Sequence, residues 1–82
     1  MPSQISNEDI QAMKTWFQNH RDSSHNGART FEQYVSLIRN AIGNNDQPFL
    51  NNALRFFGKI GGAGFEKVNA VSDLTYLTTV VK

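Results

Sequence analysis

The sequence predicts an all-α fold, a compact single-domain bundle of four or five short helices. Apolar residues recur every three to four positions along most of the chain, which is the period of an amphipathic helix. Side chains typical of helix N-caps precede several of these stretches, and glycine-containing segments separate them. The chain has 82 residues, enough for one hydrophobic core, so we expect residues 1–82 to form one domain. The expected helices cover residues 7–20, 31–42, 48–60, 64–71 and 73–81.

The helix expected at 7–20 has a clear start. Ser6 and Asp9 have the spacing of a capping box, and Ile5 and Ile10 have that of a hydrophobic staple around it. The segment "RDSSHNG" from Arg21 is rich in turn-forming residues and should end this helix. The apolar residues on its expected buried face are Ile10, Met13, Trp16 and Phe17.

The helix expected at 31–42 has the most regular pattern in the chain. Thr30 and Gln33 again have capping-box spacing. Gly43 is expected to end the helix in the left-handed conformation. The apolar face follows the i, i+3, i+4, i+7 rule and consists of Phe31, Tyr34, Val35, Ile38, Ala41 and Ile42.

The helix expected at 48–60 starts after Asp46, an N-cap residue, with Pro48 in the first turn. Phe56 lies off the apolar stripe, so more than half of the circumference is apolar. This helix is therefore either central in the fold or carries an exposed aromatic side chain for a partner. The apolar stripe itself consists of Phe49, Leu50, Ala53, Leu54, Phe57 and Ile60.

The last twenty residues fit two structures. Phe65, Val68, Val71, Leu74 and Leu77 recur every three positions, as in a helix, and Ser72-Asp73 is a suitable cap for a final helix. The segment "LTYLTTVV" is also rich in β-branched residues, which favour strands. A lone strand would have no partner elsewhere in the chain, so we expect helices at 64–71 and 73–81.

Composition and charge exclude several classes of protein. There is no cysteine, so neither disulfides nor thiolate metal sites are expected. The first residues do not resemble a secretory signal, and no apolar run approaches the ~18 residues of a membrane span. Eight basic residues oppose seven acidic ones, a net charge of +1 that offers little for nonspecific nucleic-acid binding. We expect a cytoplasmic protein.

The segment "GKIGGAG" at 58–64 holds four of the six glycines. A Walker-type phosphate loop would need Ser or Thr after Lys59, and neither the spacing nor the preceding helix fits a dinucleotide-binding fingerprint. The run "FGKIGGAGFEKVNAVSDLTYLT" resembles the helix-hairpin-helix and related SAM-like helical domains. That resemblance implies a glycine turn between two helices whose backbone N–H groups contact a DNA phosphate. The alternative is that the glycines only allow two helices to turn sharply and pack closely.

A nucleic-acid site at this turn would use the basic residues around it. Arg55 and Lys59 are four apart and so share a helix face, with Arg39 as a further basic neighbour. A solvated surface is the other interpretation of these side chains. The positions that we assign to the nucleic-acid alternative are Arg55, Lys59, Gly61, Gly62 and Lys67.

The segment "HRDSSH" holds the other potentially reactive side chains. His20, Asp22 and His25 are possible metal ligands, and Ser23 or Ser24 is a possible partner for a histidine. A polar connecting segment explains the same residues, and most acidic residues stand at expected helix starts, where they favour the helix dipole. We therefore expect no catalytic residue, no metal and no cofactor.

Aromatic residues point to the function that we expect. Six Phe, two Tyr and one Trp make nine, whereas a core of this size holds roughly five or six. The adjacent pairs Trp16-Phe17 and Phe56-Phe57 should each place one ring in the core and one at its margin. Partly exposed aromatic residues beside arginine are typical of binding surfaces. The other interpretation is a wide apolar face that fills a small core. We expect a non-catalytic protein–protein binding module, a small regulator, inhibitor or adaptor that binds another protein or itself, through Trp16, Arg55, Phe56 and Tyr76.

Overall fold

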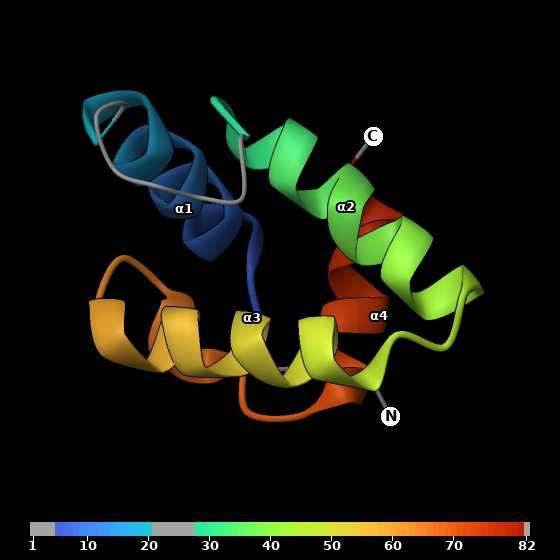
Figure 1. Cartoon of the computed structure of the whole chain (residues 1–82). Coiled ribbons are helices and arrows are strands. Elements are labelled where there is room, and N and C mark those ends of the chain that lie inside the picture. The colour runs from blue at the N-terminus through green and yellow to red at the C-terminus, as the bar shows by residue number, and fades with distance from the viewer. Residues whose placement is uncertain (1–4, 21–27, 82) are drawn as a thin grey trace.

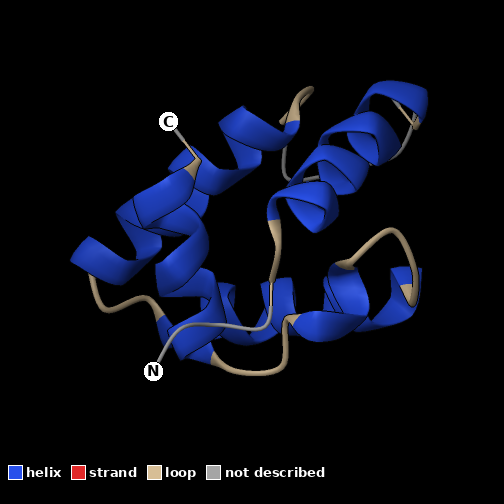
Figure 2. Ribbon diagram, turned by 180° about the vertical axis from the view of Figure 1, so that it is seen from behind, coloured by secondary structure: helices blue, strands red, loops and turns tan. Residues whose placement is uncertain are grey.

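Helices make up the regular structure of residues 5–20 and 28–81, the part of the chain that the computed structural model describes, and no strand occurs there (Figure 2). The elements are α1 (Asn7–Asn19), α2 (Phe31–Gly43), α3 (Gln47–Ile60), a turn of 3-10 helix η1 (Phe65–Lys67) and α4 (Val71–Val80). The predicted all-α bundle is thus confirmed.

The helix α2 contacts α1, α3 and α4. In Figure 1, α3 lies below α1 and α2, and α4 lies beside α2. The helix α3 packs against α2, α4 and η1. Both α2 and α3 thus pack against three other elements.

The predicted N-caps of the first three helices are present. The Ser6 hydroxyl accepts from Asp9 N–H at 3.2 Å, and the Asp9 carboxylate accepts from Ser6 N–H at 2.9 Å. The Thr30 hydroxyl accepts from Gln33 N–H at 3.1 Å. The Asp46 carboxylate accepts from Phe49 N–H at 3.2 Å. Each bond satisfies an N–H group that the first turn of a helix leaves without a partner.

The left-handed residue after α2 is Asn45 and not Gly43. Gly43 is the last helical residue, whereas Asn45 has φ of 56°. Asparagine is one of the few residues other than glycine that tolerates this conformation. The helix therefore ends close to the predicted position, but the left-handed residue that follows it is an asparagine and not the predicted glycine.

The expected helix at 64–71 is wrong. Only Phe65–Lys67 form a turn of 3-10 helix, and Val68 and Ala70 are extended. The physical reason lies at the start of the expected helix and just before it, where Gly61, Ala63 and Gly64 have φ of 67°, 54° and 85°. Three left-handed residues within four positions turn the chain sharply, and a helix restarts only at Val71.

The C-terminal segment is helical, as preferred over a strand, but α4 starts at Val71 and not at residue 73. Asp73 acts from inside the first turn: its carboxylate accepts from Asn69 N–H at 2.9 Å and Ala70 N–H at 3.2 Å. The β-branched Thr75 fits the helix because its hydroxyl donates to Val71 O at 3.1 Å.

The core lies where the four helices meet and is almost entirely apolar. The fully buried large side chains are Met13, Phe17, Phe31, Tyr34, Val35, Ile38, Leu50, Phe57, Phe65, Leu74 and Leu77.

No helix in the described ranges is long and apolar enough to cross a membrane.

Candidate functional site

The nine aromatic side chains divide between the core and its margin. Both adjacent pairs split as predicted, because Phe17 and Phe57 are fully buried whereas Trp16 and Phe56 are half-buried. The other aromatic residues at the margin are Phe49 and Tyr76. The five in the core are Phe17, Phe31, Tyr34, Phe57 and Phe65.

The two marginal rings of these pairs meet each other. Trp16 of α1 and Phe56 of α3 have ring centroids 6.0 Å apart at an interplanar angle of 74°, an edge-to-face contact. Trp16 also makes edge-to-face contacts with Phe17 at 5.4 Å and Phe65 at 5.7 Å. Three Phe rings therefore hold the indole in one orientation while part of it remains exposed to solvent.

His20 covers another part of the indole. Its ring stacks on Trp16 with centroids 4.1 Å apart and an interplanar angle of 10°. Its Nδ1 lies 2.7 Å from Trp16 O, so the side chain also closes the last turn of α1. Asp22, Ser23, Ser24 and His25, the other candidates in "HRDSSH", lie outside the described residues. Among residues 5–20 and 28–81, no group of three or more His, Asp or Glu could hold a metal ion.

Arg55 lies beside Phe56 on the exposed part of α3. Asn52, Arg55, Phe56 and Lys59 occupy positions i, i+3, i+4 and i+7, so all four share one face of the helix. Asn52, Arg55 and Lys59 are exposed, and Phe56 is half-buried. We call these four residues together with Trp16 the ring-and-cation surface.

Tyr76 does not join this surface. It is half-buried on α4, which lies on the side of the molecule away from the C-terminal half of α1 in both Figures 1 and 2. The structure therefore brings together three of the four predicted protein-binding positions, Trp16, Arg55 and Phe56, and separates the fourth.

The glycine segment is a joint that packs against α1. Gly61 is the left-handed C-cap of α3, and its N–H already donates to Phe57 O at 3.2 Å. Gly64 is buried, and a Cβ placed on it would lie 2.9 Å from Asp9 Cβ and 3.1 Å from Asp9 O. Only glycine allows the loop to approach the first turn of α1 so closely. The hairpin of two helices implied by the helix-hairpin-helix resemblance is absent here, because η1 and extended residues follow the turn.

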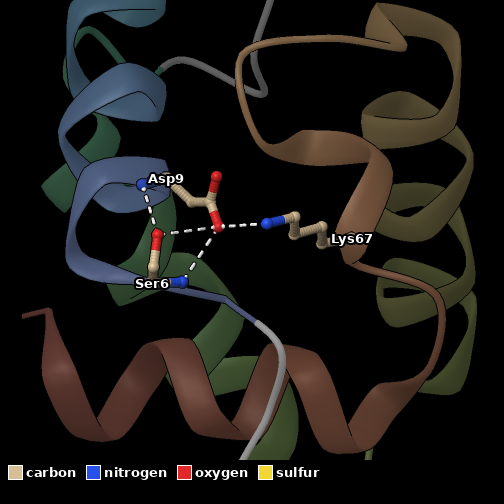
Figure 3. A network of polar contacts seen from close by, with 3 residues as sticks. All are labelled: Ser6, Asp9 and Lys67. Carbon is tan, nitrogen blue, oxygen red and sulfur yellow. Dashed lines mark hydrogen bonds and ion pairs between the residues drawn. The ribbon is translucent and has the colours of Figure 1, made fainter.

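Lys67 takes part in the same contact between the loop and α1. Its ammonium donates to the Asp9 carboxylate at 2.9 Å, and that carboxylate also accepts from the Ser6 hydroxyl at 3.0 Å (Figure 3). The Ser6 backbone N–H and then the Lys67 ammonium hold the pKa of Asp9 below its usual value. Asp9 in turn raises the pKa of Lys67. Lys67 thus links η1 to α1. No local pattern in the sequence indicates a pair whose members are 58 residues apart.

Arg39 is also used within the fold and not as part of a basic patch on α3. Its Nη2 donates to Thr78 O at 2.8 Å and to Val81 O at 2.9 Å, at the C-terminal end of α4. The last turn of α4 has no basic residue of its own, so an arginine from α2 supplies the positive charge that this end of a helix favours.

Comparison of the chain with models of protein families, with curated proteins and with solved structures finds no match.

Proposed function

We propose that this chain is a non-catalytic protein-binding module, a small regulator, inhibitor or adaptor, whose partner is another protein or a second copy of itself. The observation that carries the proposal is the contact between two half-buried rings, Trp16 and Phe56, beside the exposed Arg55. Tryptophan and arginine are enriched among the residues that contribute most to protein interfaces.

The geometry supports binding because the rings are held in place before any partner arrives. Trp16 contacts Phe17, Phe56 and Phe65 and stacks on His20. A fixed aromatic side chain loses little conformational entropy when a partner covers it, so more of the contact energy remains for affinity. The apolar area of the two rings then provides the anchor, and the polar side chains around it form the rim.

A non-catalytic function fits the use of the acidic residues. Asp9, Asp46 and Asp73 each accept hydrogen bonds from backbone N–H groups at helix starts. Glu32 forms an ion pair with Lys14 at 3.6 Å. These four carboxylates are used to cap helices and to pair with a lysine.

Some of the residues assigned to the nucleic-acid alternative already form contacts within the fold. Lys67 is paired with Asp9, and the Gly61 N–H donates to Phe57 O, so Arg55 and Lys59 are its remaining cations. Two lysine or arginine side chains on a chain of net charge +1 release few counterions from DNA.

Site-specific photo-crosslinking tests the proposal. Phe56 is replaced by benzoylphenylalanine, which keeps an aromatic ring at that position, and Thr79 on the exposed part of α4 is replaced in the same way as the control. We expect irradiation in the native cell lysate to yield a discrete protein adduct from position 56 and none from position 79. Irradiation of the purified protein alone shows whether the adduct is a second copy. No adduct from position 56, or equal adducts from both positions, would contradict the proposal.

A further inference from the structure

The ring-and-cation surface carries two cations that form no ion pair with the described part of the chain. The described chain contains six Lys or Arg residues, and three of them are used within the fold: Lys14 pairs with Glu32, Lys67 with Asp9, and Arg39 binds carbonyl groups of α4. Among residues 5–20 and 28–81, Arg55 and Lys59 form no ion pair. Both are exposed.

The helix α3 itself offers these two cations no acidic neighbour. Its sequence, "QPFLNNALRFFGKI", contains no Asp or Glu, and its cap Asp46 stands nine positions before Arg55. The exposed residues between Asp46 and Arg55 are Gln47, Pro48, Asn51 and Asn52, and none of them carries a charge. Lys59 also complements the negative C-terminal end of the helix dipole, but Arg55 lies more than a turn before that end.

The half-buried Phe56 stands between these charges on the same face. Arg55 precedes it by one position and Lys59 follows it by three, and the Trp16 ring meets it from α1. Gly58 is exposed nearby, with no atom within 4 Å of the place where a Cβ would lie, so the neighbouring surface is open to a ligand. An apolar anchor flanked by two unneutralised cations is complementary to an apolar side chain flanked by carboxylates.

We propose, building on the protein-binding function above, that the ring-and-cation surface binds an acidic segment of a partner protein. An aliphatic or aromatic side chain of that segment covers Trp16 and Phe56, while its carboxylates pair with Arg55 and Lys59. Arg55 has the planar donor geometry that binds a carboxylate through two parallel hydrogen bonds. The exposed amides of Asn51 and Asn52 add neutral hydrogen-bonding groups along the same helix.

Fluorescence anisotropy with three labelled probes tests this inference. The probes are a peptide that alternates glutamate with leucine and phenylalanine, the same peptide with lysine in place of glutamate, and a short DNA duplex. We expect the acidic peptide to bind more tightly than the other two, with an affinity that falls as salt is added. Lys59→Glu and Arg55→Glu should each weaken its binding about fivefold, since rim charges contribute modestly.

Arg29→Glu is the matched control. Arg29 is exposed and lies before α2, so the substitution changes the net charge equally but leaves the ring-and-cation surface intact. The control should bind the acidic peptide as the unmodified protein does. Equal weakening of peptide binding by Arg29→Glu and Lys59→Glu would show that binding depends on net charge alone, which would overturn the inference.

The other outcomes separate this inference from the function on which it rests. A protein adduct from position 56 without binding of the acidic peptide would overturn the inference and leave the protein-binding function intact. Tighter binding of the DNA duplex, weakened by Lys59→Glu but not by Arg29→Glu, would overturn both and assign the surface to nucleic acid.

Discussion

Gly58 and Gly64 stand six residues apart in one glycine-rich segment, yet their surroundings are opposite. Gly64 has φ of 85°, and a Cβ on it would lie 2.9 Å from Asp9 Cβ. Gly58 lies within α3 and has open space around it. The clustering of glycines in the sequence therefore marks one close contact and does not mean that each glycine is needed.

Gly64→Ala should destabilise the protein by at least about 2 kcal/mol, because it combines left-handed strain with a clash against the α1 backbone. Gly58→Ala, the matched control, should stabilise it by about 0.5–1 kcal/mol, because alanine favours a helix interior. Urea unfolding of both variants measures the difference. Similar effects from the two substitutions would show that the loop does not press on α1.

The Asp9 carboxylate should make stability depend on acid pH. Its pKa in the folded protein is lowered by Ser6 and Lys67, so its contribution is present above the unfolded-state pKa of about 3.9 and is lost as pH falls through the lowered value. Asp9→Asn, which removes the titrating group, should show a smaller loss of stability below about pH 4 than the unmodified protein. Thermal unfolding across this pH range checks it, and identical pH profiles would contradict it.

Arg39 links two helices, because it extends from α2 and binds the C-terminal end of α4. Arg39→Ala should destabilise the protein by about 1 kcal/mol, because the carbonyl groups of Thr78 and Val81 at the C-terminal end of α4 lose a charged donor that is itself exposed to solvent. Arg29→Ala is the control, since Arg29 is exposed and lies just before α2. Chemical denaturation of both variants provides the comparison; equal stability of the two would argue against a capping role for Arg39.

The elements that could be predicted from the sequence are those whose start is fixed by a local contact. Ser6, Thr30 and Asp46 each bind an N–H three residues ahead, so the pattern in the sequence is the interaction itself. The prediction of a helix at 64–71 is wrong because an apolar spacing of three residues also fits other backbone conformations. The side chains Phe65 and Val68 are indeed buried, but from a 3-10 turn and an extended residue.

The candidate site was predictable to the same extent. Adjacent aromatic pairs on a helix must point in different directions, so the marginal positions of Trp16 and Phe56 followed from helix geometry. Their contact with each other did not, because it depends on how α1 packs near α3. The same holds for Lys67, whose partner Asp9 lies 58 residues away, and for Tyr76, which α4 places on another side of the molecule.

At the scale of the whole molecule, all the helices contribute to one continuous hydrophobic cluster. The single tryptophan, Trp16, contacts rings from α1, α3 and η1 and so reports on packing between distant parts of the chain. Unfolding followed by Trp16 fluorescence and by far-ultraviolet circular dichroism should give coincident transitions. Loss of the fluorescence signal before the helical signal would show that the ring contacts open independently of the bundle.

NMR tests most directly whether the ring-and-cation surface is the one that contacts the acidic peptide. Amide and indole N–H resonances of the isotopically labelled protein are followed while the acidic peptide is added. We predict that the largest shifts occur at Trp16, Arg55, Phe56 and Lys59, with little change along α4. Shifts concentrated on α4, or no shifts beyond those caused by the lysine-containing peptide, would contradict the assignment of the ring-and-cation surface.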